Sequence, residues 1–138
     1  MIYTNSDGGA RGNPGPAAIG VIVRKDGEIL KKWSEIISEN TTNNVAEYHG
    51  LIKALELAYE FTNDTVTCLL DSELIVKQLL GEYQVKHPKM KELFLKVQKL
   101  QDKFKKIIYL HVPRTDKFQQ IADELLNDEL DNKGYRRK

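Results

Sequence analysis

The sequence predicts an α/β domain in which helices pack on both faces of a mixed five-stranded sheet. Strand-like alternation and a tight turn mark an antiparallel meander within the first 37 residues. Two later apolar runs, Thr65–Leu70 and Ile107–Val112, each follow a segment with helical spacing. Because helical crossovers return the chain in the same direction, the first, fourth and fifth strands should run parallel.

The three strands of the meander are separated by recognisable turn sequences. Ile2–Asp7 forms the first strand, and Gly8–Pro16 is so rich in Gly and Pro that neither helix nor strand is expected there. Ala18–Arg24 is a second strand rich in β-branched residues. Asp26-Gly27 is a strong two-residue hairpin signal, and Glu28–Ile37 is the returning strand.

Four helices are expected from capping residues and apolar spacing. Thr41–Asn44 is a cluster of capping residues, Ser72 can cap a short helix, and Gly81 ends it. The helices should run from the Thr41–Asn44 cluster to about Phe61, over Glu73–Leu80, over Lys89–Lys103 and over Phe118–Leu130.

Length and composition indicate one ordinary globular domain. The 138 residues suit a single domain over 1–138, with a polar C-terminal tail, frayed or weakly docked, from about 131 to 138. Apolar runs are too short to span a bilayer, and the N-terminus lacks the features of a secretory signal. Cys68, the single cysteine, cannot form an internal disulfide and is expected to be a buried thiol. These features favour a cytoplasmic protein without a membrane partner.

The overall charge of +1 says nothing about nucleic acid, but the charge distribution is uneven. Between residues 86 and 106, eight lysines face two acidic residues, a local balance of +6. Such a stripe can hold phosphates and make binding salt-dependent. A solvated helix face explains the same pattern equally well.

Four carboxylates are placed where the predicted fold could bring them together. Asp7 ends the first strand and Asp71 follows the fourth, so neighbouring parallel strands would present both at one sheet edge. Glu47 lies in the first turn of the connecting helix, in line with its apolar face. Asp123 flanks the apolar stripe of the last helix. Each one taken singly could be a solvated surface charge, and Asp71 could simply help to cap a helix.

Converging carboxylates repel one another and need a compensating charge. Two divalent cations about 3.5–4 Å apart can supply it, and can activate water and stabilise a leaving oxygen in phosphodiester hydrolysis. Mg²⁺ suits an all-carboxylate site, with Mn²⁺ as a plausible substitute. Zn²⁺ prefers Cys or His, and Cys68 and the three histidines show no metal-ligand spacing.

At this point the chain resembles a known family. Four motifs, Asp7–Pro16, Thr41–Glu47, Leu70–Ser72 and Ile121–Asp123, resemble those of type 1 ribonuclease H in order and approximate spacing. The resemblance covers roughly residues 1–127, and the motifs are specific as a set. It implies an endonuclease that hydrolyses the RNA strand of RNA–DNA hybrids and leaves 5′-phosphate and 3′-hydroxyl ends. It implies two Mg²⁺ ions held by the four carboxylates, Asp7, Glu47, Asp71 and Asp123.

The resemblance also implies the substrate contacts. The backbone of Gly8, Gly9 and Ala10, with Asn13 and Asn44, would meet the RNA strand near its 2′-hydroxyls, the groups that distinguish RNA from DNA. Glu47 would serve both as metal ligand and as acceptor for a 2′-hydroxyl. Thr42 and Asn43 would help to hold a DNA phosphate, a role compatible with helix capping. The expected partner is the hybrid duplex, and the protein is expected to act as a monomer.

The chain departs from the family pattern in two places. Many members carry a basic insertion after the Asp71 helix, whereas here residues 81–88 lead directly into one Lys-rich helix, as in a compact subgroup. Many members also have a loop histidine before the last carboxylate. His111 falls within the predicted strand instead, and Arg114 in the loop is the candidate for that supporting catalytic role. Arg114 could equally be a phosphate contact or a surface residue.

Three other functions compete with this interpretation of the sequence. A binding module on the same fold, without catalysis, is the main alternative, and loss of a carboxylate would favour it. A phosphate-binding metabolic enzyme is disfavoured because the Gly-rich segment lacks the ending of a P-loop. A transposase-like DNA nuclease would share the carboxylates, but the Gly8–Pro16 and Thr41–Asn44 segments favour hybrid recognition.

Overall fold

A computed structural model describes residues 1–136. Within this range the chain forms five strands and four helices. In chain order they are β1 (Ile2–Ala10), β2 (Gly15–Lys25), β3 (Glu28–Thr41), α1 (Asn43–Ala58), β4 (Thr65–Leu70), α2 (Glu73–Leu79), α3 (Pro88–Gln101), β5 (Lys106–His111) and α4 (Lys117–Asn132). Among residues 1–136, no helix combines the length and the apolar composition that a membrane span requires.

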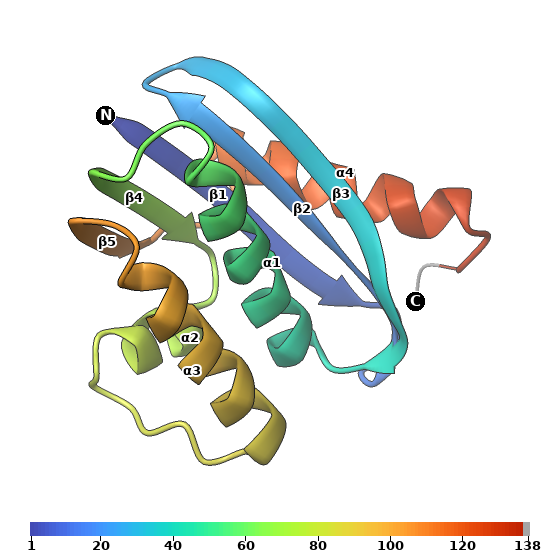
Figure 1. Ribbon diagram of the computed structural model, residues 1–138. Helices are drawn as coiled ribbons and strands as arrows, with labels where there is room; N and C mark the ends of the chain where they lie inside the picture. The colour runs from blue at the N-terminus through green and yellow to red at the C-terminus, as the bar shows by residue number, and fades with distance from the viewer. Residues whose placement is uncertain (137–138) are drawn as a thin grey trace.

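The strands form one sheet in the order β3-β2-β1-β4-β5. The pairs β1–β2 and β2–β3 are antiparallel, whereas β1–β4 and β4–β5 are parallel. Helix α4 covers one face of the sheet, and α1, α2 and α3 pack together on the other face (Figure 1). The predicted fold class, a mixed five-stranded sheet with helices on both faces, is confirmed. The parallel strands place the C-terminal ends of β1 and β4 side by side.

The main hydrophobic core lies between the sheet and the α1, α2 and α3 layer. Tyr48, the largest fully buried side chain, projects from α1, and its hydroxyl donates to Gln78 Oε1 of α2 at 2.6 Å. Cys68 of β4 is fully buried, as expected, and this burial raises the pKa of its thiol to about 12. The core therefore fixes α1 against the ends of β1 and β4.

The Gly-rich segment differs from the prediction. Gly8–Ala10 continues β1 in antiparallel pairing with Ala17–Ile19, and β2 begins at Gly15. The expectation that residues 8–16 contain no strand was therefore wrong, except for the turn at residues 11–14. Strand pairing satisfies the backbone groups of these residues, which outweighs their low strand propensity. Among the other elements, β3 extends to Thr41 and α1 ends at Ala58.

Two glycines allow α1 to lie unusually close to β1. A Cβ atom at Gly8 would come within 2.2 Å of the carbonyl carbon and oxygen of Ala46. A Cβ atom at Gly50 would lie 2.9 Å from the carbonyl oxygen of Asp7. Neither separation is compatible with a side chain without a shift of the backbone. The absence of side chains at these positions therefore brings the end of β1 against the first turns of α1.

Arg11, in the turn after β1, connects that turn to the end of α4. Its buried guanidinium donates to the carbonyl oxygens of Asn127 and Tyr135 and pairs with Asp131 at 2.7 Å. Tyr135 in turn packs against the small cluster formed by α4 and β2. Of the tail expected from 131 to 138, the first two residues complete α4, and residues 137 and 138 lie outside the described part.

Candidate metal-binding active site

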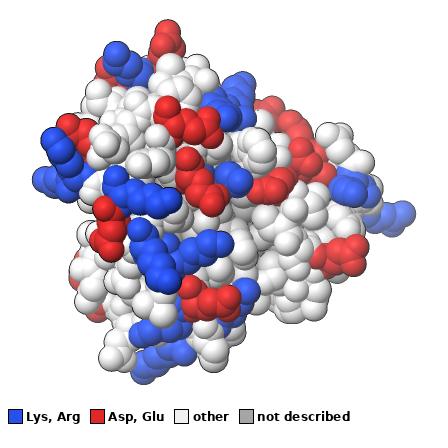
Figure 2. Space-filling view, in the orientation of Figure 1, with Lys and Arg blue, Asp and Glu red and all other residues white. Residues whose placement is uncertain are grey.

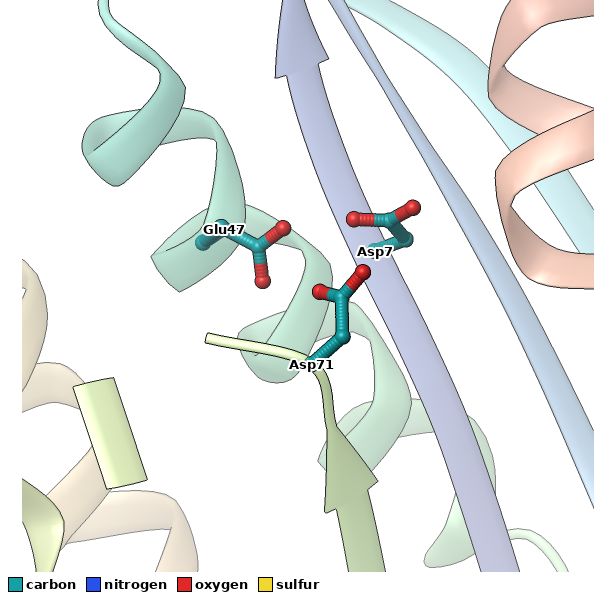
Figure 3. Close-up of side chains that lie close together, drawn as sticks. All are labelled: Asp7, Glu47 and Asp71. Atoms are coloured by element: carbon teal, nitrogen blue, oxygen red, sulfur yellow. The ribbon is translucent and has the colours of Figure 1, made fainter. Parts of the chain in front are cut away.

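Three acidic side chains from three different elements meet at one edge of the sheet. Asp7 projects from β1, and Asp71 directly follows β4. Glu47 projects from the second turn of α1, not from the first turn as predicted. One carboxylate oxygen of each lies within 4.8 Å of the others. Figure 3 shows the three carboxyl groups pointing toward one another across the gap between β1, β4 and α1. The predicted meeting of Asp7 and Asp71 at this edge thus has its structural basis in the parallel β1–β4 pair.

These carboxylates have few protein partners although they are buried. Asp7 and Glu47 are each only 6% exposed. The Gly8 N–H donates to Asp7 Oδ1 at 2.9 Å and to Glu47 Oε1 at 3.1 Å. Glu47 Oε2 is buried and has no hydrogen-bond partner among the described residues. A buried carboxylate oxygen without a donor is costly unless a cation compensates it.

Burial raises the pKa of all three groups. The pKa of Asp7 lies well above its ordinary value because of burial, with further increases from Glu47 and from the charges of Asp71 and Asp123. Burial raises the pKa of Glu47 to about 7, although the Gly8 N–H lowers it. Burial also raises the pKa of Asp71, while the charge of Arg114 lowers it. Without a cation, burial therefore favours the protonated forms of these carboxyl groups.

The donor set fits a hard divalent cation such as Mg²⁺ or Mn²⁺. Such ions take oxygen ligands, and the cluster consists of carboxylates with one unpartnered buried oxygen. The cluster opens into a pocket of about 360 Å³, so there is also room for water and substrate oxygens. The described histidines and the cysteine form no metal-binding group with these residues.

Asp123 approaches the same pocket from the opposite face of the sheet. It projects from the second turn of α4, lines the pocket and raises the pKa of both Asp7 and Asp71 by its charge. It is not one of the three residues of the close cluster. Its side chain is exposed, whereas those of Asp7 and Glu47 are buried. The structure therefore gives a compact triad with a fourth carboxylate at its rim.

Arg114 lies at the mouth of the pocket, in the loop between β5 and α4. Its side chain is 91% exposed, and its Nε lies 3.8 Å from Asp71 Oδ2. His111 lies in β5, as expected, although the strand ends there and not at Val112, and its charge also lowers the pKa of Asp71. Arg114 is thus placed to act on Asp71, on a substrate, or on both.

The predicted substrate-contact residues form a connected rim beside the triad. Asn43 Oδ1 accepts from the Ala10 N–H at 2.7 Å, and the Asn43 N–H donates to Asn13 Oδ1 at 3.0 Å. Thr42 caps α1 by accepting from the Val45 N–H. The pocket is lined by Gly8, Gly9, Ala10, Asn43 and Asn44. Thr42 and Asn13 are not among its lining residues and instead support this rim.

Sequence reasoning missed Asn127, which also lines the pocket. Its Nδ2 donates to the carbonyl oxygen of Asp123, and its Oδ1 accepts from Arg11. The four-residue spacing from Asp123 places it on the same side of α4 and was the available signal. Arg11 gave no such signal, because its partners lie more than 110 residues away.

Comparison with known proteins agrees with this arrangement. The family model described as "Reverse transcriptase-like" matches residues 5–128. LC11-RNase H1, isolated from compost by a metagenomic approach and solved in complex with an RNA/DNA hybrid, has a TM-score of 0.89 and 42% identity. That match covers 96% of this chain and 99% of the LC11 chain. The chain belongs to the type 1 ribonuclease H family. Members of this family are hydrolytic endonucleases.

Other ribonucleases H extend the comparison. The RNase H1 structure from the halophilic archaeon Halobacterium salinarum has a TM-score of 0.88 at 37% identity and covers 95% of this chain and 98% of its own. The Mycobacterium tuberculosis "Bifunctional protein Rv2228c" is 40% identical over 94% of this chain. This chain spans only 35% of that relative, and 65% of the Halobacterium salinarum ribonuclease HI sequence.

The resemblance stated from the four motifs is therefore confirmed. The chain also has the predicted compact form without the basic insertion. Only residues 80–87 separate α2 from α3, and α3 leads directly to β5. Helix α3 itself carries four exposed lysines, Lys89, Lys91, Lys96 and Lys99. Figure 2 shows basic side chains over the part of the face that α3 forms in Figure 1.

Proposed function

We propose that this ribonuclease H hydrolyses the RNA strand of RNA–DNA hybrids endonucleolytically, leaving 5′-phosphate and 3′-hydroxyl ends. The main support is the buried triad of Asp7, Glu47 and Asp71, whose oxygens approach within 4.8 Å and include the unpartnered Glu47 Oε2. A relative of 42% identity was solved with an RNA/DNA hybrid, which supports the same class of substrate.

In this proposal Asp7, Glu47, Asp71 and Asp123 hold two Mg²⁺ ions, with Mn²⁺ as a substitute. When bound, these ions would activate a water and stabilise the leaving oxygen of the scissile phosphodiester. The protein contributes the position of its ligands. The Gly8 N–H orients Asp7 and Glu47 together, and Arg114 favours the ionised form of Asp71 by its charge. Glu47 also accepts a hydrogen bond from a 2′-hydroxyl.

The rim beside the triad would recognise the two strands. The backbone of Gly8, Gly9 and Ala10, with Asn13 and Asn44, contacts the RNA strand near its 2′-hydroxyls, which DNA lacks. Thr42 and Asn43, at the N-terminus of α1, hold a phosphate of the DNA strand, where helix N–H groups favour negative charge. The bonds that join Asn43 to Ala10 and Asn13 support this assignment, because they hold both contact regions in one unit.

Arg114 is assigned a supporting catalytic role at the pocket mouth, and a phosphate contact is the alternative. We further propose that the protein acts as a monomer in the cytoplasm, without a membrane partner. The free Cys68 thiol, which is buried and unreactive, is compatible with a reducing compartment.

The proposal is tested with one end-labelled RNA strand, presented in a hybrid, as double-stranded RNA and single-stranded, with and without Mg²⁺ or Mn²⁺. Metal-dependent cutting of the hybrid alone is expected. Asp71→Asn is the matched variant, since it removes the charge without changing the size, and it should abolish cleavage while the protein stays folded.

A non-catalytic module that binds hybrids is the competing function. It predicts that the wild-type protein retains the hybrid in a gel-shift assay and cuts no strand with either metal. Cleavage of double-stranded RNA at a similar rate would instead show a relaxed specificity and would contradict the proposed recognition of the DNA strand.

A further inference from the structure

A buried pair of amide side chains lies directly beside the acidic site. Asn5 precedes Asp7 by two residues in β1, so both side chains point to the same face of the sheet. Gln119 precedes Asp123 by four residues in α4, so these two also share a side. Asn5 Nδ2 donates to Gln119 Oε1 at 3.2 Å, and both side chains are fully buried. The amide pair therefore connects β1 to α4, the two elements that carry Asp7 and Asp123.

The orientation of this pair is fixed by further hydrogen bonds. Gln119 Nε2 donates to the carbonyl oxygen of Ser6, the residue before Asp7, at 2.8 Å. Arg24 Nε donates to Asn5 Oδ1 at 3.0 Å, which leaves Asn5 Nδ2 for Gln119. The guanidinium of Arg24 lies over the ring of Phe118, 4.0 Å from its centroid. Each of the two amide groups thus has a single orientation in which both its oxygen and its nitrogen form these hydrogen bonds.

A second contact fixes α4 on the other side of Asp7. Gly20 of β2 is paired with Asp7 in the strand register. A Cβ atom at Gly20 would lie 2.0 Å from the carbonyl oxygen of Ala122, the residue before Asp123. Helix α4 is therefore held against the sheet at Gln119 and again at Ala122, about one helical turn later.

Asp123 itself contributes nothing that would hold α4 near the triad. Its carboxylate accepts no hydrogen bond from the described residues. The Asn127 side chain donates to the backbone carbonyl of Asp123 instead. When both are ionised, Asp7 and Asp123 repel one another across the pocket. The neighbouring amide pair opposes this repulsion, together with the hydrogen bonds from Arg11 to Asn127 further along α4.

We propose that Gln119, oriented by Asn5 and Arg24, is a positioning residue that keeps Asp123 within reach of the metal site formed by the triad. This inference rests on the metal binding of the proposed function. It assigns to a buried amide, which touches neither metal nor substrate, the task of placing the fourth carboxylate.

The test measures Mn²⁺ binding by isothermal titration calorimetry, with the metal alone and no nucleic acid. Gln119→Met keeps the length of the side chain and removes both hydrogen bonds. We expect it to weaken Mn²⁺ binding by about tenfold, as when outer partners of metal ligands are removed. Val97→Ala is the control, since it opens the core between α3 and α1, on the opposite face, and should lower Tm without changing Mn²⁺ affinity.

A double-mutant comparison identifies the residue through which Gln119 acts. Asp123→Asn alone should weaken Mn²⁺ binding, and Gln119→Met should cause no further loss in that background. An equal loss in both backgrounds, an unchanged affinity in Asp123→Asn, or a loss of Tm alone in Gln119→Met would overturn the proposal.

The same measurements distinguish failure of the proposed function from failure of the positioning role. Wild-type protein that binds Mn²⁺ but leaves the hybrid uncut contradicts the proposed function, and the double-mutant comparison of Mn²⁺ affinities still tests the positioning role. Wild-type protein that binds no Mn²⁺ overturns the inference itself. If Gln119→Met does not fold, Gln119→Asn takes its place, because its shorter amide can reach only one of the two partners and should also weaken Mn²⁺ binding.

Discussion

The carbonyl group of Ala46 in α1 occupies the space that a side chain at Gly8 of β1 would need, only 2.2 Å from the ideal Cβ position. This close approach lets one backbone group serve two carboxylates. The Gly8 N–H donates both to Asp7 Oδ1 and to Glu47 Oε1. The distance between strand and helix therefore decides whether Asp7 and Glu47 can share a cation.

Gly8→Ala should separate α1 from β1 and so damage both stability and catalysis. A methyl group forced against backbone atoms costs about 1–3 kcal/mol or more. We expect a lower urea midpoint together with weaker Mg²⁺ activation of hybrid cleavage. Gly27→Ala is the matched control, because nothing lies within 4 Å of its Cβ position, in a hairpin remote from the triad. Normal Mg²⁺ activation in Gly8→Ala would mean that this contact does not set the geometry of the triad.

The sequence predicted the elements that carry the triad because their signals are local. Strand alternation, capping residues and the Asp26-Gly27 turn led to the sheet, and the parallel crossover then placed Asp7 beside Asp71. The direction of Glu47 followed from the apolar face of its helix. The strand, capping and turn signals depend on residues within one or two turns of each other, which is the range over which sequence periodicity is informative.

The features that escaped prediction depend on contacts between distant residues. Residues 8–10 form a strand because β2 pairs with them, although these residues have a low strand propensity. The bond between Asn5 and Gln119 joins residues 114 positions apart, and no local pattern announces it. The same holds for Arg11 and the end of α4. Tertiary pairing overrode local propensity at the segment that borders the site.

The metal-free protein should lose stability as the pH rises from about 4.5 to about 7. Glu47 has its pKa raised from 4.5 to about 7 on folding, and the pKa values of Asp7 and Asp71 are raised as well. Between the unfolded and folded values the folded state binds more protons, so the free energy of unfolding falls as pH increases. For Glu47 the loss is on the order of a few kcal/mol.

Chemical unfolding at a series of pH values checks this prediction, with Glu47→Gln as the reference. The neutral side chain removes one titrating group, so the variant should gain stability over the wild type as the pH rises. Other surface groups affect both proteins equally and cancel in the difference. Saturating Mg²⁺ should restore the wild type at pH 7–8, because the cation replaces the protons. A constant difference between the two proteins at every pH would contradict the raised pKa values.

The lysines of α3 should contribute to binding of the hybrid. Lys89 and Lys96 are exposed, and their charges lower the pKa of His49 on α1, which places them on the α1 side of this helix. Replacing Lys89, Lys96 and Lys99 with Gln should raise KM and flatten its dependence on salt. Each lost phosphate contact lowers the slope of log K against log[salt] by about one.

A second triple variant controls for the change in net charge. Lys25, Lys31 and Lys32 lie in the β2–β3 hairpin, remote from the triad and outside the basic stretch of residues 86–106. Their replacement with Gln should leave the salt slope unchanged. If the α3 variant changes KM and its salt slope no more than this control does, α3 presents a solvated basic face and takes no part in substrate binding.

Arg114 offers the sharpest distinction between chemistry and binding. Its guanidinium lies 3.8 Å from Asp71 Oδ2 and lowers the pKa of that carboxyl group, which the proposed cation would bind in its ionised form. Arg114→Ala should therefore reduce kcat by about tenfold, less than the 10²–10³-fold loss typical of a preorganised buried donor, because the side chain is exposed.

The pH–rate profile separates the two roles of this arginine. Without Arg114 the pKa of Asp71 rises further, so the acidic limb of kcat against pH should move to higher pH, whereas Arg114→Lys retains the charge and should keep the limb in place. A phosphate contact instead predicts a higher KM with the limb unmoved, because a guanidinium paired with the phosphate in the complex would no longer offset the charge of Asp71. That result would transfer Arg114 from the catalytic group to the substrate-binding rim.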